Sequence, residues 1–132
     1  MFEPRRATKG SCGYDFYSPR EYELMPGEWT TIDTGVRLTD DDVCEDFDRW
    51  FMGVVPRSGL SFHHGLRIRN TIGVIDMDYR DTIKCKVTVD EPYTLEVGER
   101  FVQGIILPFG TLANEIKPTE NRKGGFGSTG KV

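Results

Sequence analysis

The strongest constraint on the fold is a strict alternation of apolar and polar residues from Ile83 to Val89. This is the pattern of a strand with one face in the core and the other in solvent. The segments Trp29–Val36 and Phe101–Leu107 are also rich in β-forming residues, and Pro108 follows the second of them. Gly and Pro turn signals separate these runs. We therefore predict an all-β fold, a sandwich or jelly roll, over residues 1–120.

The segment from Asp40 to Phe51 leaves two interpretations open. Val43 and Phe47 fall at helix-like spacing with Trp50 or Phe51, and the acidic start suits a helix N-terminus. An acidic surface loop fits the same residues equally well. No other window shows a helical apolar face over several turns.

Composition and charge exclude several classes of function. The chain has 132 residues and a formal net charge of -4 without basic clusters, which disfavours sequence-independent nucleic-acid binding. No stretch is apolar enough to span a bilayer, and the first ten residues lack the apolar core of a signal peptide. Cys12, Cys44 and Cys85 are isolated, which fits a reducing compartment, so we expect a cytoplasmic protein. The adjacent His63 and His64 are expected to be surface or loop residues, not a metal site.

The C-terminal segment, residues 121–132, differs from the rest in composition. It reads NRKGGFGSTGKV and contains four glycines. Such a segment buries too little apolar surface to order itself, so we predict a flexible lid of the same domain. Phe126 can stack on a base, and Ser128 and Thr129 can supply hydroxyl and amide groups to a phosphate.

Four other short segments carry polar groups whose role the residues alone leave open. Pro56–Leu60 is either a plain turn or an anion site built from backbone amides and an arginine. In Asn70–Tyr79, Asp76 follows an apolar run and is a candidate general base toward water. The alternative is a β-hairpin whose aspartates are merely solvated. Taken alone, Gly10–Asp15 and Gly98–Gln103 are weak signals.

Taken together and in this order, the five segments resemble the five motifs of the trimeric, all-β dUTPase family. The matching sequences run from Ser11 to Gly130 and read SCGYDFYS, PRSGL, NTIGVIDMDYR, GERFVQ and RKGGFGSTG. The resemblance implies a jelly-roll (β-clip barrel) subunit, a homotrimer whose active sites draw motifs from more than one subunit, and a mobile C-terminal tail that closes over the site. It also implies hydrolysis of dUTP to dUMP and pyrophosphate, supported by Mg²⁺.

The same resemblance implies a role for individual residues. It places the catalytic carboxylate at Asp76, which would activate water for attack on the α-phosphorus, and it places Asp15 at the metal through water. The other matched residues would contact dUTP: Arg57, Ser58, Gly59 and Gln103 at the phosphates, Asn70 with Gly73, Val74 and Ile75 at uracil, Tyr79 under the deoxyribose, Lys84 close to the substrate, Phe126 on uracil, and Arg122, Gly127, Ser128 and Thr129 over the terminal phosphates.

The sequence also departs from the family pattern. Asp81-Thr82 replaces the usual Gly-Glu pair, and the spacer from Arg122 to Gly-Gly-Phe is one residue shorter than in many relatives. The first motif begins close to the start of the sequence, so we expect an altered sheet edge there. The acidic Asp40–Asp48 segment is longer than usual and is a candidate surface for a regulatory protein partner. Two rival functions remain as alternatives: a dCTP deaminase, which shares this fold, and a regulatory binding module on the same fold.

Overall fold

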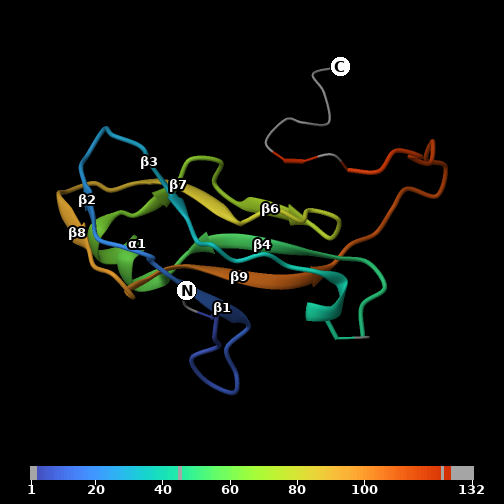
Figure 1. The fold of residues 1–132 in the computed structure, drawn as a ribbon, viewed down its shortest axis with the longest axis horizontal. Helices are drawn as coiled ribbons and strands as arrows, with labels where there is room; N and C mark the ends of the chain where they lie inside the picture. Colours follow the sequence, from blue (N-terminus) through green and yellow to red (C-terminus); the bar gives the residue numbers. More distant parts are fainter. Residues whose placement is uncertain (1–2, 45, 123, 126–132) are drawn as a thin grey trace.

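The computed structural model describes residues 3–44, 46–122 and 124–125, which form three small antiparallel sheets around one core (Figure 1). The first sheet has the order β1-β9-β4-β6, the second pairs β2 with β8, and the third has the order β3-β7-β5. Their bounds are β1 Gly13–Tyr17, β2 Tyr22–Leu24, β3 Thr30–Asp33, β4 Trp50–Pro56, β5 Arg67–Ile68, β6 Gly73–Asp76, β7 Lys84–Thr88, β8 Tyr93–Leu95 and β9 Arg100–Pro108.

All three sheets contribute side chains to the same hydrophobic cluster. Phe16 and Phe101 come from the four-stranded sheet, Ile32 and Val87 from the third sheet, and Leu95 from the second. Each of these side chains is fully buried, so the sheets are held together by shared apolar contacts rather than by continuous strand pairing.

The predicted all-β architecture is confirmed, because each of the three predicted strand segments contains an observed strand. β7 lies within Ile83–Val89, β3 within Trp29–Val36, and β9 spans Phe101–Leu107.

A short helix, α1 (Ser58–His64), was not predicted, and Pro56–Leu60 is therefore not a plain turn. Arg57 is the N-cap of α1, and Gly65 ends the helix in the left-handed conformation. Leu60 is the only fully buried residue of α1. Two turns with one buried side chain are too short to show a helical period in the sequence.

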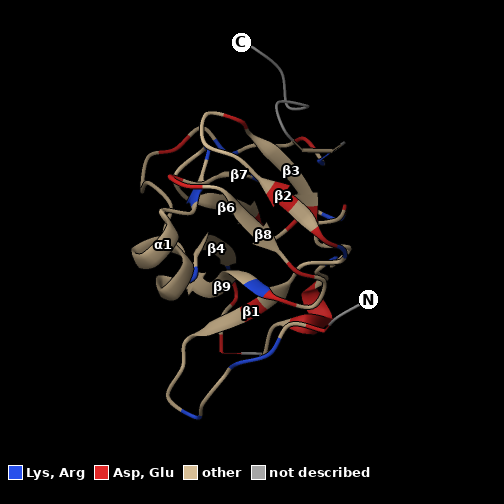
Figure 2. Ribbon diagram, turned by 90° about the vertical axis from the view of Figure 1, so that its left-hand side faces the viewer, with Lys and Arg blue, Asp and Glu red and all other residues tan. Residues whose placement is uncertain are grey.

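Two interpretations of the acidic segment were left open, a helix and a surface loop, and its described residues before β4 follow the surface loop. The 3-10 turn η1 (Asp40–Asp42) is followed by irregular backbone in the described residues 43–44 and 46–49, and β4 begins at Trp50. The Asp42 carboxylate accepts a hydrogen bond from the Thr39 backbone amide, at 2.7 Å, which closes the turn. The turn shows as an acidic coil in Figure 2, and Asp42 lines the same cavity as Glu3 and Pro4. Within the described residues, no helix is long and apolar enough to cross a membrane.

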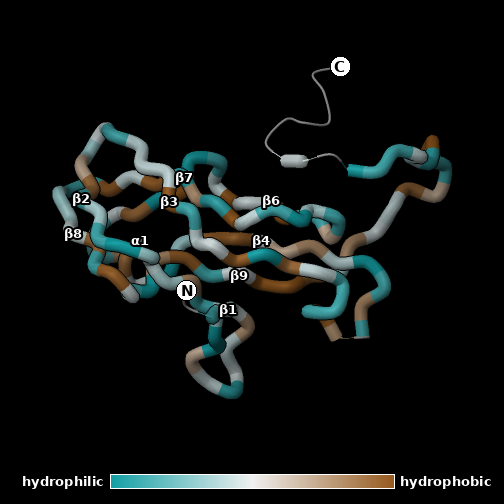
Figure 3. The backbone as a smooth tube through the Cα atoms, in the orientation of Figure 1, coloured by the Kyte–Doolittle hydropathy of each residue, from teal (hydrophilic) through white to brown (hydrophobic). Residues whose placement is uncertain are grey.

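After β9 the chain leaves the barrel as an extended segment, residues 109–121, which we call the C-terminal arm (Figure 1). Its apolar side chains include Leu112, 80% exposed, and Ile116, 99% exposed. Figure 3 shows hydrophobic stretches on the arm, outside the body of the subunit. Large apolar side chains exposed together often mark an interface.

Candidate active site

A cavity of about 400 Å³ lies beside β6, at the edge of the four-stranded sheet. Because β6 pairs only with β4 in the described sheet, the other side of its backbone is available to hydrogen-bond a ligand. The structure brings the following predicted residues together around this cavity: Asn70, Gly73, Val74, Ile75, Asp76, Tyr79, Lys84 and Arg122.

The segment Asn70–Tyr79 is not a β-hairpin, which corrects one of the two interpretations of its sequence. β5 pairs with β7, whereas β6 pairs with β4, so the turn from Asn70 to Ile72 crosses between two sheets. Thr71 has a φ of 67°, a backbone conformation that residues other than glycine rarely adopt. The Ile72 amide donates to the Asn70 carbonyl at 2.7 Å. Strained turns of this kind cluster at functional sites, and this one presents Asn70 to the cavity.

Asp76 stands at the end of β6 with its carboxylate half-exposed at the cavity. Arg122, from the C-terminal segment, forms a close ion pair with Asp76, and its Nε donates to Asp78 Oδ1 at 2.7 Å. The hydrogen bond with Asp78 and the charge of Asp76 raise the pKa of Arg122. The arginine is itself only 17% exposed, so it covers one side of Asp76 in this structure.

Tyr79 forms part of the cavity wall and is 6% exposed. Its hydroxyl donates to the Thr82 carbonyl at 2.7 Å, and burial raises its pKa. Gly125 lies against the ring so closely that a Cβ at this position would come within 2.5 Å of Tyr79 Cε1. The C-terminal segment therefore covers the tyrosine as well as Asp76.

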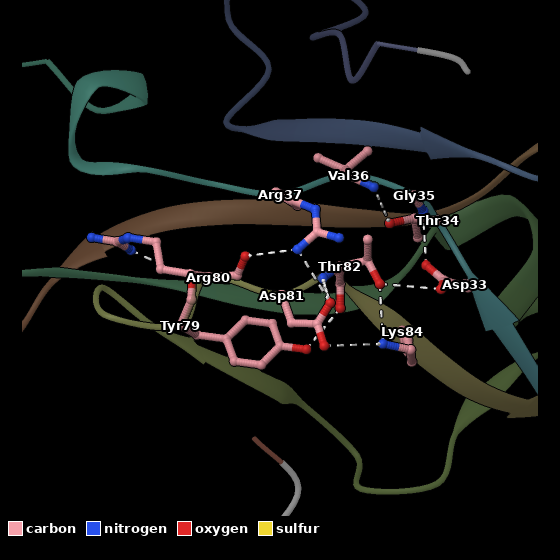
Figure 4. Close-up of polar contacts among 10 residues, drawn as sticks. All are labelled: Asp33, Thr34, Gly35, Val36, Arg37, Tyr79, Arg80, Asp81, Thr82 and Lys84. Carbon is pink, nitrogen blue, oxygen red and sulfur yellow. Dashed lines mark hydrogen bonds and ion pairs between the residues drawn. The ribbon is translucent and has the colours of Figure 1, made fainter. Parts of the chain in front are cut away.

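A polar network adjoins this wall (Figure 4); the sequence singled out Lys84 and the Asp81-Thr82 pair, but not their contacts with Asp33 and Arg37. The Thr82 hydroxyl donates to Asp33 at 3.1 Å and accepts from Lys84 Nζ at 3.0 Å. Asp81 lies 3.9 Å from Lys84 Nζ and 3.4 Å from Arg37. A hydrogen bond from the Thr82 backbone amide, with Lys84 and Arg37 nearby, lowers the pKa of Asp81.

A second group of predicted residues gathers where β1, β9 and the start of α1 meet. Asp15 is buried and accepts from Arg57 Nε at 3.1 Å, while its other oxygen pairs with Arg100 at 3.5 Å. Gln103 lies opposite Asp15 in the β1–β9 register and donates to the Pro56 carbonyl at 3.3 Å. Asp15 thus holds two guanidinium groups in place, which suits an anion site.

The start of α1 completes this second group. A cavity of about 420 Å³ is lined by Arg57, Gly59, Arg100 and the two histidines of α1. Ser58 and Gly59 form the exposed first residues of the helix. Their backbone amides belong to the first turn, where no carbonyl of the same helix can accept from them.

Within one chain, the residues around Asp76 and those around Asp15 lie far apart. Asp15 and Asp76 lie on the two edge strands of one sheet, so three strand spacings, about 14 Å, separate them across it. Register adds a displacement along the strands: Asp15 is level with Val55 of β4, and Asp76 with Phe51. Val55 and Phe51 are four residues apart on β4, which corresponds to about 13 Å along the strand. A single chain therefore does not place both groups on one reacting phosphate.

The described residues contain no group of three His, Cys, Asp or Glu side chains that could hold a metal ion. Both oxygens of Asp15 face arginine side chains, whose positive charges disfavour direct coordination of a cation by this carboxylate. The remaining predicted contacts, Phe126, Gly127, Ser128 and Thr129, lie outside the described residues.

Comparison with known proteins identifies the family of the chain. A family model described as dUTPase matches residues 3–130. The deoxyuridine 5'-triphosphate nucleotidohydrolase of Nautilia profundicola is 36% identical over 134 residues, covering 97% of this chain and 90% of that protein.

Two solved phage enzymes share the fold. A mutant dUTPase of Staphylococcus bacteriophage 80alpha, solved with dUpNHpp, gives a TM-score of 0.74 at 23% identity and covers 93% of this chain and 92% of that one. A mutant dUTPase from phage phi11 of S. aureus, which reveals the coordination of a structural Mg(II) ion, gives 0.71 at 22% identity over the same shares. Because the family model covers nearly the whole chain and the bacterial relative is 36% identical over 97% of it, the chain belongs to the dUTPase family and is a dUTP diphosphatase.

Proposed function

We propose that Asp76 orients and deprotonates the water that attacks the α-phosphorus of dUTP. The water oxygen forms a bond to this phosphorus, the bond to the bridging oxygen breaks, and pyrophosphate leaves. The observation that carries the proposal is the position of Asp76, a half-exposed carboxylate at the end of the strand that borders the cavity. Its pairing with Arg122 would give way as the nucleotide takes up the guanidinium.

The cavity beside β6 would bind the nucleoside. Asn70 offers a donor and an acceptor, and the backbone of Gly73, Val74 and Ile75 offers further groups along the edge of the strand. Cytosine reverses the donor and acceptor pattern of uracil, so it would leave polar groups mispaired. Tyr79 would pack under the deoxyribose and exclude a 2′-hydroxyl.

The second group would bind the phosphates. Arg57, Ser58, Gly59 and Gln103 are close together, and Asp15 fixes Arg57. The separation of this group from Asp76 favours a site completed by another copy of the chain. We therefore propose a homotrimer, with the exposed C-terminal arm as one of its contacts. Lys84 would lie near the nucleoside side of this shared site.

The C-terminal segment would act as the lid. Arg122 already reaches the cavity, and it would turn to the terminal phosphates together with Gly127, Ser128 and Thr129. Phe126 would stack on uracil. Closure of such a segment would exclude bulk water from the reacting phosphate.

Magnesium fits this site as an ion carried on the triphosphate rather than held by a protein cage. Asp15 would reach it through water, in keeping with the water ligands that Mg²⁺ retains. When bound, the ion would neutralise phosphate charge and orient the oxygens. The phage phi11 relative supports metal binding in the family, although for that enzyme the ion is described as structural.

Replacing Asp76 with Asn tests the proposal directly. The amide keeps the size of the side chain but cannot accept the proton, so kcat for dUTP should fall by about 10²- to 10⁴-fold, the usual contribution of a general base. Binding of dUpNHpp, a non-hydrolysable analogue of dUTP, should persist when it is measured by calorimetry. Pyrophosphate release with Mg²⁺ gives kcat.

Asp48→Asn, in the exposed acidic loop, is the matched control and should turn over dUTP like the wild type. An Asp76→Asn enzyme with near-normal kcat would remove the proposed role of this carboxylate. Release of ammonia from dCTP by the wild type would instead favour the deaminase.

A further inference from the structure

We propose that Thr82 and Asp33 are positioning residues of the nucleotide pocket: Asp33 orients the Thr82 hydroxyl, and Thr82 holds the side chains of Lys84 and Tyr79 that line the cavity. Neither Thr82 nor Asp33 is itself part of the cavity lining. They would act on the substrate only through the two side chains that they hold. The inference rests on the proposed function in one respect, that this cavity binds the nucleoside of dUTP.

The direction of the hydrogen bonds fixes the Thr82 hydroxyl. Lys84 Nζ lies 3.0 Å from Thr82 Oγ1, and Thr82 Oγ1 lies 3.1 Å from Asp33 Oδ2. An ammonium can only donate and an ionised carboxylate can only accept, so the hydroxyl accepts from Lys84 and donates to Asp33. A hydroxyl that does both is held in one orientation, and each of the two bonds strengthens the other.

The β3–β7 pairing anchors both ends of this chain of hydrogen bonds, Lys84 and Asp33. Asp33 and Lys84 are register partners in the β3–β7 ladder, and the second oxygen of Asp33 accepts from the Gly35 amide at 2.9 Å. Asp33 is exposed, so direct attraction between its charge and Lys84 would be screened by water. The Thr82 hydroxyl supplies the directional contact that charge alone does not provide.

The backbone of Thr82 holds Tyr79. The Tyr79 hydroxyl donates to the Thr82 carbonyl, and the Thr82 amide donates to Asp81 Oδ1 at 2.7 Å. One residue therefore positions both the phenol and the ammonium on the wall of the cavity (Figure 4). This is also the position where Thr replaces the glutamate expected from the family pattern.

Thr82→Val is the central test, because valine keeps the shape of threonine but loses the hydroxyl. We expect KM for dUTP to rise by about three- to tenfold, the effect of losing one such hydrogen bond, while kcat stays within about twofold. Thr82→Ser, which keeps the hydroxyl, should restore the wild-type KM. Thr94→Val is the matched control, since it removes a hydroxyl that donates to Glu23 in the separate β2–β8 sheet.

A double-mutant cycle distinguishes positioning from a general loss of structure. If Thr82 acts through Lys84, the Thr82→Val effect on KM should shrink in a Lys84→Met background. A wild-type KM in Thr82→Val, full additivity with Lys84→Met, or no rescue by serine would overturn the inference. Should Thr82→Val fail to fold at the assay temperature, Asp33→Ala, which leaves Thr82 in place but removes the acceptor of its hydroxyl, must raise KM in the same direction. If Asn70→Ala left KM for dUTP unchanged, the proposed nucleoside site itself would be refuted, whereas a raised KM in Asn70→Ala together with any of these contrary results would refute only the positioning role.

Discussion

Cys85 combines deep burial with a place on the wall of the cavity beside β6. It lies on β7, is 3% exposed, and burial raises the pKa of its thiol to about 12. The thiolate is the reactive form of cysteine, so at neutral pH the Cys85 thiol is protonated and unreactive. Cys12 and Cys44 are exposed instead.

Alkylation should therefore distinguish the three cysteines of the native protein. With iodoacetamide at about pH 8, Cys12 and Cys44 should be modified and Cys85 protected, because its pKa lies far above that pH. Peptide mass spectrometry measures the extent at each site. Denaturation before alkylation should bring Cys85 to the level of the others, and equal labelling in the folded protein would contradict its burial.

At the scale of elements, α1 carries part of the proposed phosphate site and depends on the residue that ends it. Gly65 has φ of 67°, and its amide donates to the Ser61 carbonyl. A Cβ at this position would come within 2.1 Å of Asp90 Oδ2. Both the conformation and the space therefore require glycine.

Gly65→Ala should lower the free energy of unfolding by about 1–3 kcal/mol, the cost of one residue forced into a disfavoured backbone conformation. Because Ser58 and Gly59 lie on the same helix, KM for dUTP should rise as well. Thermal or urea unfolding measures the stability. Gly10→Ala is the control, since a Cβ there meets no other atom within 4 Å; equal effects of the two substitutions would contradict this account.

The three predicted strands were predictable from local signals, namely the alternation of apolar and polar residues in Ile83–Val89 and the β-forming residues of Trp29–Val36 and Phe101–Leu107. The connections were not, because β6 pairs with β4 and not with the nearer β5. Nothing in the sequence of Asn70–Tyr79 specifies a distant partner strand. The positive φ of Thr71 was also invisible, since threonine is an uncommon choice for that conformation.

The candidate site shows the same difference between local patterns, which the sequence contains, and long-range contacts, which it does not. The motif around Asp76 predicted residues that are close in sequence, and the structure places them around one cavity. Asp33 lies 49 residues from Thr82, and their contact depends on the β3–β7 register, which the sequence does not state. Sequence reasoning therefore found the polar residues of the cavity wall, but not its apolar lining from β4, β5 and β7 or the contact of Thr82 with Asp33 behind it.

At the scale of the whole molecule, the subunit has an apolar arm outside its core. Leu112 and Ile116 have few apolar neighbours in the single chain, as their exposure shows. A trimer contact would remove them from water, which is favourable in proportion to the apolar area buried.

Replacing both Leu112 and Ile116 with Asp should shift the protein from the proposed trimer to a monomer in sedimentation velocity, because two charges would have to be buried at the contact. dUTP hydrolysis should fall with the loss of trimer, while the β-sheet circular dichroism remains. Val97→Asp, at an exposed apolar residue outside the arm, should leave the assembly intact. A double variant that stayed trimeric would exclude the arm from the interface.

The distance between Asp15 and Asp76 within one sheet has a genetic consequence for the proposed trimer. Two alleles, one defective in the nucleoside half and one in the phosphate half, would each be inactive when expressed alone. In a cell that makes both products, mixed assemblies would contain some sites whose two halves are both intact. The two lesions would then complement each other, although they lie in the same gene.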